Sequence, residues 1–261
     1  MPQPPNSNGN HPGDKLLAGH NLQKTYSGRR VVDDVSLNVA KGEVVGLLGA
    51  NGAGKTTMIK LLLGLLKPTA GVVRVFGQDP VFPLSRKRVG TTPQNIDFPE
   101  GLKVKEVIEF AACHYSNPLS LTSIAEMFEI SDLLNSKAAK LSGGQKRRVA
   151  LALAFVGNPN LVFLDEPTTG LDVGARKNLL DKIYSEYKKG KTIFLTTHYL
   201  GEIESIATRV LFLHKGRISF DGTVDELKKT ASSSLKRVIF YSTEKVSLES
   251  LSSIEKFSEQ D

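Results

Sequence analysis

The spacing of apolar positions changes along the chain where the predicted elements change. Residues 31 to 40 alternate apolar and polar side chains, as a strand with one covered face does, and residues 44 to 48 form a continuous apolar run before Gly49. The following segment has helical length and apolar content, and we expect that helix to begin at Lys55 and to end at Pro68. The pattern predicts a strand, a glycine-rich turn and a helix in succession, which is half of a β-α-β unit.

Two further apolar runs have the character of buried strands. "LVFLD" ends at Asp165 and "KTIFLTTH" ends at His198. Continuous apolar runs are typical of parallel strands that are covered on both faces. Before the first of these two runs, residues 101 to 156 lose the strand pattern and carry helical segments such as "VKEVIEFAACHY". The sequence therefore predicts an α/β protein with an inserted helical segment.

The two ends of the chain differ in composition from the middle. Residues 1 to 14 are polar and rich in proline and asparagine, and lack the charged start and apolar core of a signal peptide, so we expect a disordered leader. Residues 229 to 261 are rich in serine and form a predicted tail or partial extension. This tail contains one possible strand at 236 to 241 and an amphipathic stretch at 247 to 257.

Composition narrows the class of protein without choosing a function. With 261 residues and 40% hydrophobic content the chain resembles ordinary globular proteins, and it has no run of 18 apolar residues that would span a bilayer. Cys113 is the single cysteine, which excludes an internal disulfide and suits a reducing compartment such as the cytosol. The net charge of +7 is compatible with nucleic acid, an anionic membrane face or an anionic ligand.

A phosphate-binding loop follows the apolar strand at 44 to 48. Residues 49 to 57, "GANGAGKTT", match the pattern G-x-x-x-x-G-K-[ST] between a strand and a helix. The glycines allow backbone N–H groups to surround phosphate oxygens, while Lys55 brings a positive charge to the β- and γ-phosphates. Thr56 is the predicted Mg²⁺ ligand. The sequence therefore predicts nucleotide binding.

Several polar residues are candidates for a site at one edge of the sheet. Asp165 and Glu166 follow a buried strand, which suits a carboxylate that serves Mg²⁺ and a second one that orients or deprotonates water. His198 ends the next strand and is expected at the same edge, near a γ-phosphate or the attacking water. Gln94 either serves Mg²⁺ or water, or is a solvated loop residue. Tyr26 either stacks on a purine ring or packs on the sheet.

The stretch "LSGGQ" at residues 141 to 145 opens a helix in an unusual way. Ser142 and Gln145 form the S-x-x-Q pattern of a helix N-terminus. Gly143 and Gly144 weaken the first turn, since glycine costs about 1 kcal/mol per helical position relative to alanine. Bare backbone amides at a helix N-terminus bind anions, so this turn is a second candidate phosphate site.

The order of these motifs resembles the ATP-binding subunit of ABC transporters. "GANGAGKTT", Gln94, "LSGGQ", "LVFLDEP", "TTGLD" and "TTH" follow one another as in that family, over residues 15 to 228. The resemblance implies a P-loop NTPase (ABC ATPase) core with a predominantly parallel sheet and an N-terminal antiparallel β portion. It also implies an α-helical subdomain at about residues 95 to 156.

The resemblance assigns a role to each candidate residue. It implies that ATP is hydrolysed by the catalytic residues Lys55, Gln94, Glu166 and His198, with Glu166 as the base. The implied ATP ligands are Tyr26, Gly49, Asn51, Gly52, Ala53, Gly54, Lys55, Thr56, Thr57, Ser142, Gly143, Gly144, Gln145 and Asp172. The implied Mg²⁺ ligands are Thr56, Gln94 and Asp165.

The resemblance also implies partners. Two nucleotide-binding subunits, in a homodimer or a heterodimer, enclose two Mg-ATP molecules head to tail, so that "LSGGQ" of one chain contacts the γ-phosphate held by the other. A separate transmembrane permease holds the subunit at the cytoplasmic face of the cell membrane. The chain is most similar to the subgroup that exports drugs, polysaccharides or other cargo, and no nucleic acid is expected.

A soluble ABC-type ATPase that acts on nucleic acid or the ribosome is the alternative. Such proteins typically carry two nucleotide domains or a long coiled coil between the phosphate loop and the "LSGGQ" stretch. Here only residues 95 to 141 separate Gln94 from Ser142, and they contain no heptad run. The sequence therefore favours a transport ATPase.

Overall fold

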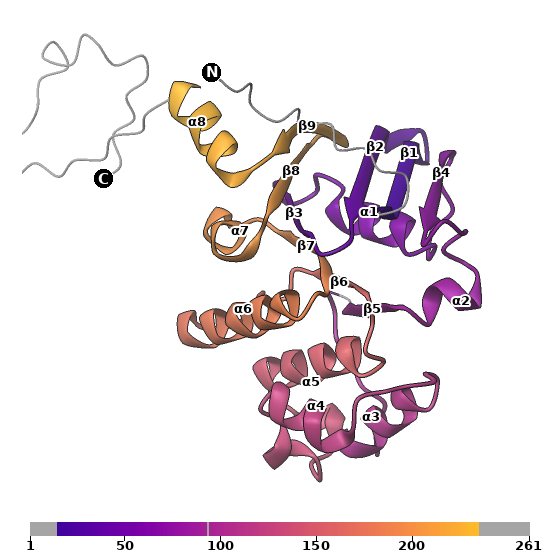
Figure 1. Ribbon diagram of the computed structural model, residues 1–261, viewed down its shortest axis with the longest axis vertical. Coiled ribbons are helices and arrows are strands. Elements are labelled where there is room, and N and C mark those ends of the chain that lie inside the picture. The colour runs from indigo at the N-terminus through magenta and orange to yellow at the C-terminus, as the bar shows by residue number, and fades with distance from the viewer. Residues whose placement is uncertain (1–14, 93, 235–261) are drawn as a thin grey trace, which may run out of the picture. The chain divides into compact units, whose positions relative to one another are not determined.

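The computed structural model describes residues 15–92 and 94–234 (Figure 1). Contacts divide the chain into two units, one that ends at Leu227 and one that begins at Lys228, and each is described by itself. Of the second unit only the end of helix α8 (Val224–Ser234) belongs to the described residues.

Three predicted features lie outside the described residues. They are the leader at 1 to 14, the possible strand at 236 to 241 and the amphipathic stretch at 247 to 257. Among the helices of the described ranges, none combines the length and the apolar character that a membrane span requires.

The first unit alternates strands and helices along the chain. The strands are β1 (Lys15–Tyr26), β2 (Arg29–Ala40), β3 (Val44–Leu48), β4 (Ala70–Val75), β5 (Val89–Thr92), β6 (Leu161–Asp165), β7 (Thr192–Thr197), β8 (Arg209–His214) and β9 (Arg217–Gly222). The helices before α8 are α1 (Lys55–Leu62), α2 (Pro83–Arg86), α3 (Val104–Ala112), α4 (Leu121–Met127), α5 (Gly143–Phe155), α6 (Val173–Lys188) and α7 (Leu200–Ile206). Two short 3₁₀ turns, η1 (Ser131–Leu133) and η2 (Ala138–Lys140), lie between α4 and α5.

The strands form two sheets. A six-stranded sheet has the order β5-β6-β7-β3-β8-β9, in which every neighbouring pair is parallel except β8 and β9. A three-stranded antiparallel sheet has the order β2-β1-β4. The predicted α/β class, with a predominantly parallel sheet and an N-terminal antiparallel portion, is confirmed.

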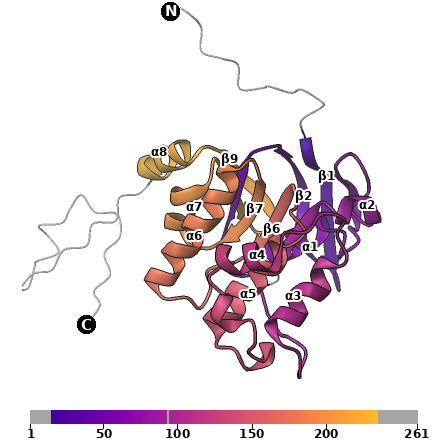
Figure 2. The same ribbon diagram turned by 60° about the horizontal axis from the view of Figure 1, so that its bottom comes forward.

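The large sheet is covered on both faces, which explains its continuous apolar strands. In β6, Val162 and Leu164 belong to the apolar core shared with the helices α3 to α7. Leu161 and Phe163 point the other way, into the core shared with the antiparallel sheet and α1. Figures 1 and 2 show α6 and α7 on one side of this sheet and α1 on the other. The prediction that these strands are buried on both sides is confirmed.

Helix α1 is shorter than the sequence pattern predicts. It ends at Leu62, whereas we expected it to reach Pro68. Gly64 has a φ of 67°, and its N–H and that of Leu65 donate to the carbonyls of Leu61 and Lys60 at 3.0 and 2.9 Å. These two bonds form a Schellman motif, in which a glycine in the left-handed conformation closes the helix. The prediction was wrong because the apolar residues after Gly64 continue the pattern without continuing the helix.

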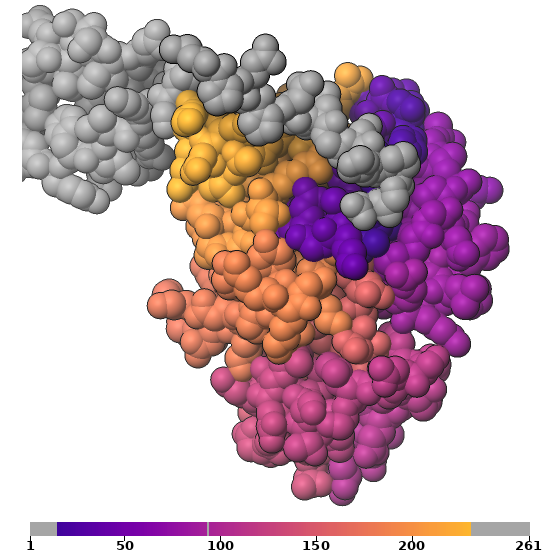
Figure 3. Space-filling view, in the orientation of Figure 1, coloured from indigo at the N-terminus to yellow at the C-terminus, as the bar shows by residue number. Residues whose placement is uncertain are grey.

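The helices α3, α4 and α5 pack on one another beyond the β5 edge of the large sheet. Their side chains gather into one lobe, coloured magenta to pink at the lower end of the space-filling view (Figure 3). Phe128 and Phe155 are buried in this lobe, with ring centroids 5.4 Å apart. The same helix α5 also packs on β5, so the lobe is joined to the sheet at its β5 edge.

Candidate functional site

The phosphate-binding loop connects β3 with α1, as the sequence predicts. Gly54 precedes the helix with a φ of 107°, and a Cβ at this position would lie 2.8 Å from the Val31 carbonyl oxygen. Only glycine fits such a backbone without strain. The Lys55 ammonium group is 5% exposed and donates to the carbonyl oxygens of Gly49 at 2.9 Å and Ala50 at 3.2 Å. The Lys55 side chain therefore folds back onto the start of the loop, and the loop carbonyls solvate its charge.

The carboxyl end of β6 places two carboxylates next to β7. The Asp165 side chain is 3% exposed and accepts a hydrogen bond from the Thr196 hydroxyl at 2.6 Å. Glu166 has a φ of 47°, in the left-handed region that non-glycine residues rarely adopt. Its N–H donates to the Thr196 hydroxyl at 3.0 Å and to the Thr196 carbonyl at 3.2 Å. Thr196 therefore holds both acidic residues and turns Glu166 away from the strand.

The Glu166 carboxylate is the meeting point of the predicted catalytic residues. Lys55 Nζ lies 3.2 Å from Glu166 Oε1, and His198 Nδ1 lies 3.6 Å from the same oxygen. Gln94 Nε2 donates to Glu166 Oε2 at 3.3 Å, and the Thr169 hydroxyl donates to it at 3.2 Å. Residues from three other segments of the chain thus converge on one carboxylate, and the expectation that Glu166 and His198 share an edge of the sheet agrees with this geometry.

Two opposing effects determine the ionisation of Glu166. Burial raises the pKa of its carboxyl group. The hydrogen bond and positive charge of Lys55, the Thr169 hydroxyl and the charge of His198 lower this pKa, and together they outweigh the effect of burial. The pKa of Glu166 is therefore below its ordinary value, and the group is an anion at neutral pH. Because Lys55 is the largest of the lowering influences, the ionisation of Glu166 depends on where that ammonium group lies.

Arg147 is a buried residue of this site that the sequence analysis did not single out. Its Nη2 donates to the Gln94 carbonyl oxygen at 3.2 Å, which fixes the start of the loop that carries Gln94. Burial lowers the pKa of Arg147, and the charges of Asp165 and Glu166 partly offset that effect. The only signal in the sequence was the basic stretch "QKRRV", which is typical of a solvated helix face.

The predicted Mg²⁺ ligands have suitable chemistry. Thr56, Gln94 and Asp165 offer a hydroxyl, an amide and a carboxylate oxygen, and such hard oxygen donors are what Mg²⁺ prefers. The amide nitrogen of Gln94 faces Glu166, which leaves its oxygen free for a cation. Within the described part of the chain, no three His, Cys, Asp or Glu side chains form a metal-binding group. These three donors suit a Mg²⁺ ion whose remaining ligands are phosphate oxygens.

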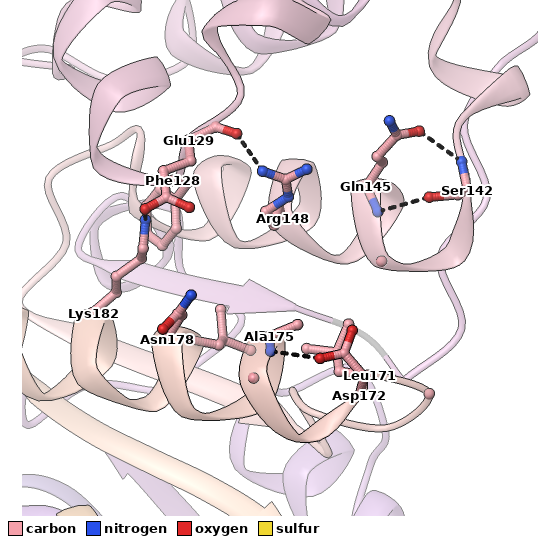
Figure 4. A pocket seen from close by; sticks show the side chains of 14 residues that line it. Phe128, Glu129, Ser142, Gln145, Arg148, Leu171, Asp172, Ala175, Asn178 and Lys182 are labelled. Carbon is pink, nitrogen blue, oxygen red and sulfur yellow. Dashed lines mark hydrogen bonds and ion pairs between the residues drawn. The ribbon is translucent and has the colours of Figure 1, made fainter.

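The "LSGGQ" residues lie at a different place, on a pocket between α5 and α6 (Figure 4). The Ser142 N–H donates to Gln145 Oε1 at 2.9 Å and the Gln145 N–H donates to Ser142 Oγ at 3.3 Å, so the predicted helix cap is present. A Cβ added to Gly143 would meet no atom within 4 Å. The first turn of α5 therefore leaves its backbone open.

Asp172 lies on the same pocket, opposite Ser142. Its side chain accepts from the Ala175 N–H at 2.9 Å and caps helix α6. The pocket has a volume of about 720 Å³, and the described residues that line it include Ser142, Gly144, Gln145 and Asp172 but none of residues 49 to 57. The sequence-predicted residues therefore form two sets on one chain: the phosphate loop with the Glu166 cluster, and the Ser142 pocket.

Tyr26 belongs to neither set. It lies at the end of β1, where a hairpin leads into β2, and its side chain is 44% exposed. The Lys24 ammonium group is 5.3 Å from its ring centroid. Val31, a few residues along β2, contacts the phosphate loop at Gly54. The exposure of Tyr26 leaves its ring free to stack on a planar ligand, and that role stays a prediction.

Comparison with known sequences relates the chain to the ATP-binding proteins of ABC transporters. The ABC transporter family matches residues 32–169 of the chain. The daunorubicin/doxorubicin resistance ATP-binding protein DrrA of Streptomyces peucetius is 39% identical over 224 residues, which cover 83% of this chain and 68% of that protein. The Nod factor export ATP-binding protein I of Burkholderia thailandensis is 40% identical over 210 residues, which cover 77% of this chain and 68% of that protein.

Solved structures show the same fold. An ATP-binding subunit of an ABC transporter has a TM-score of 0.75 and 32% identity, with 83% of this chain and 93% of that chain covered. A dimeric ATP-binding cassette, in a post-hydrolysis state with ADP and phosphate, has a TM-score of 0.74 and 26% identity. The match covers 80% of this chain and 99% of that chain.

Proposed function

The chain belongs to the ABC transporter family as an ATP-hydrolysing, ATP-binding subunit, and from this premise we propose that it works as a dimer around two Mg-ATP molecules and powers export through a separate membrane permease. The similarity to DrrA and to the Nod factor export protein, both named as ATP-binding proteins, supports export rather than import. The dimeric cassette among the similar structures supports the dimer.

The separation of the predicted ligands into two sets carries this proposal. The phosphate loop and the Glu166 cluster contain the groups that would hold a γ-phosphate and activate the attacking water, while Ser142 and Gly144 of the open first turn of α5 lie on another pocket. A helix N-terminus with bare amides is an anion site, yet this chain's own phosphate loop lines no part of that pocket. In a head-to-tail dimer each set completes the other chain's site.

Within one site the residues divide the work. When ATP binds, its phosphates attract the Lys55 ammonium group away from Glu166, which leaves that carboxylate free to take a proton from water. Thr56, Asp165 and the Gln94 amide would hold Mg²⁺, which offsets the charge of the phosphates when bound. His198 lies 3.6 Å from Glu166, which supports a role for it in contacting either the γ-phosphate or the attacking water.

A mixed dimer tests the shared site. One chain carries Lys55→Ala and the other carries Ser142→Arg, with a different affinity tag on each so that only heterodimers are purified. Each homodimer has two damaged sites, whereas the heterodimer retains one site with an intact Lys55 and an intact Ser142. We therefore expect the heterodimer to regain hydrolysis that both homodimers lack.

The mixed dimer experiment has a matched control and a clear contradicting outcome. Ser120→Arg is the matched substitution, because Ser120 caps α4 in the way that Ser142 caps α5 but lies outside both sets. We expect the Ser120→Arg homodimer to stay active, which separates the loss of a cap from the loss of a ligand. A purified heterodimer that is as inactive as both parents would contradict the shared site.

An exposed apolar surface supports contact with a permease. Val81, Phe82 and Leu84, at and before helix α2, are 54%, 57% and 68% exposed. They adjoin a cavity of about 240 Å³ lined by Leu65 and Tyr115 among others. Exposed apolar side chains that gather in one place mark interaction sites. This surface borders the lobe of α3 to α5, where nucleotide-driven movement would be transmitted.

Variants of this surface test the membrane partner. We expect Phe82→Asp to release the chain from the membrane fraction of its source cells while the purified chain still hydrolyses ATP. Tyr184→Asp on α6, where the ring is 38% exposed, is the control and is expected to stay with the membrane. Equal recovery of both variants in the membrane fraction would contradict the proposed surface.

A further inference from the structure

Glu202 is a buried carboxylate that the hydrolysis chemistry described above does not use. It lies in the first turn of α7 and is 2% exposed. The Thr168 hydroxyl donates to its Oε1 at 2.6 Å and the Thr197 hydroxyl donates to its Oε2 at 2.6 Å. Both threonines are themselves buried, at 2% and 1% exposure. A carboxylate this far from solvent is costly unless its oxygens are bonded, so the three side chains form one constrained unit.

One threonine lies in the loop that carries Glu166, and the other lies at the strand end that carries His198. Thr168 follows Glu166 by two positions, in the loop that runs from β6 to Asp172 at the start of α6. Thr197 is the last residue of β7 and immediately precedes His198. Glu202 therefore ties the loop after Glu166 to the strand end that carries His198.

A second route leads from Glu202 to His198 through aromatic contacts. Arg176 on α6 places its Nε 3.5 Å from Glu202 Oε1 and its guanidinium carbon 4.7 Å from the Tyr199 ring centroid. The Tyr199 and His198 rings have centroids 4.0 Å apart. The histidine ring thus also contacts a chain of side chains that begins at the same carboxylate.

We propose that Glu202 is a positioning residue for ATP hydrolysis, which holds the His198 loop against the Glu166 loop. This inference rests on the proposed role of His198 at the γ-phosphate. His198 Nδ1 and Glu166 Oε1 are 3.6 Å apart, and no hydrogen bond of His198 Nδ1 to another described residue fixes that separation. The separation depends on the loops, and a displacement of about 1 Å in an active site can slow a reaction by about a hundredfold.

Removing one hydroxyl at a time tests the tie without removing the charge. We expect Thr168→Val and Thr197→Val each to lower kcat by about ten- to a hundredfold, with ATP affinity within about twofold of wild type. Thr168→Ser and Thr197→Ser retain the hydroxyl and are expected to restore most of kcat. Phosphate release gives kcat, and a fluorescent nucleotide titration gives affinity.

A threonine at the other end of β7 gives the stability control. The Thr192 hydroxyl is buried and accepts from the Gly42 N–H at 2.8 Å, far along the strand from His198. We expect Thr192→Val to lower Tm about as much as Thr197→Val does while kcat stays at the wild-type value. If the three valine variants lose kcat only in proportion to Tm, Glu202 is a structural residue and the proposal is wrong.

A His198→Ala variant separates failure of this inference from failure of the proposed function. We expect it to lose kcat as the threonine variants do. If His198→Ala is inactive but Thr168→Val and Thr197→Val hydrolyse ATP like wild type, Glu202 does not position His198, although the role of His198 stands. If His198→Ala itself keeps full kcat, the proposed role of His198 is wrong, and the role of Glu202 fails with it.

Discussion

Replacing Glu166 by glutamine separates its contribution to catalysis from its contribution to stability. The substitution keeps the shape of the side chain and removes its charge, so the ion pair with Lys55 at 3.2 Å is lost. The Lys55 charge is not left without partners, because its bonds of 2.9 and 3.2 Å to two loop carbonyls remain. We therefore expect a stability loss of about 1.5–3 kcal/mol, as for one hydrogen bond to a charged group. A buried charge left without partners would cost about 3–5 kcal/mol.

The loss of activity is expected to be larger than the loss of stability. A positioned general base contributes about 10²–10⁴ in rate, which is about 3–5 kcal/mol in the barrier at 1.36 kcal/mol per tenfold. ATP affinity is expected to stay the same or rise, because a negative charge is removed from the neighbourhood of the phosphates. Steady-state phosphate release, a nucleotide titration and urea unfolding measure the three quantities on one preparation.

A surface variant with the same charge change is the control. Glu126 is exposed on α4, so Glu126→Gln is expected to match wild type in all three assays. If Glu166→Gln hydrolyses ATP at a rate within about threefold of wild type, Glu166 is not the base and the chemical reasoning above is wrong. If instead the variant loses ATP affinity, the carboxylate supports the nucleotide site rather than the reaction.

The remaining predictions concern Lys55, the end of helix α1 at Gly64, and the stability of the protein at acid pH. We expect Lys55→Ala to weaken ATP affinity at least about tenfold, and an unchanged titration would contradict the phosphate loop. Gly64→Ala is expected to lower the free energy of unfolding by about 1–2 kcal/mol because φ is positive there, whereas Gly201→Ala in α7, where φ is not positive, is expected not to destabilise. Because the folded-state pKa of Glu166 lies below its ordinary 4.5, the stability that Lys55 confers is present above that pH. It is lost as pH falls through the lowered value, so the difference in urea stability between wild type and Glu166→Gln is expected to shrink in acid.

The elements that the sequence predicts well are those buried on both faces. The runs at 161 to 165 and 192 to 197 are apolar throughout because each side of the sheet meets a different core. β9 (Arg217–Gly222) has no fully buried residue, and β5 has only the four residues Val89–Thr92. Such strands carry too few apolar positions for a period to be recognised. Their place in the sheet depends on pairing with distant segments, which periodicity does not record.

The candidate site divides in the same way. Lys55 and Thr56 follow from a spacing that local backbone geometry imposes, and Glu166 and His198 follow from the rule that parallel strands end at one edge. Arg147 and Glu202 could not be found by either argument. Each is a charged residue on a helix with an ordinary polar pattern, and its role depends on burial that only the packed structure creates.

The ion pair between Lys55 and Glu166 connects nucleotide binding with the reactivity of the base. Two effects of opposite sign act on the pKa of Glu166: burial raises it, and Lys55 is the main influence that lowers it. Phosphate oxygens compete for the same ammonium group, so bound ATP reduces the lowering influence and leaves burial in place. Under the proposed function we therefore expect the pKa of Glu166 to rise when ATP binds, toward the range in which a carboxylate accepts a proton from water effectively. Under the proposed function, Glu166 would become reactive as a base only when ATP is bound, because Lys55, which would then bind the phosphates, pairs with Glu166 beforehand.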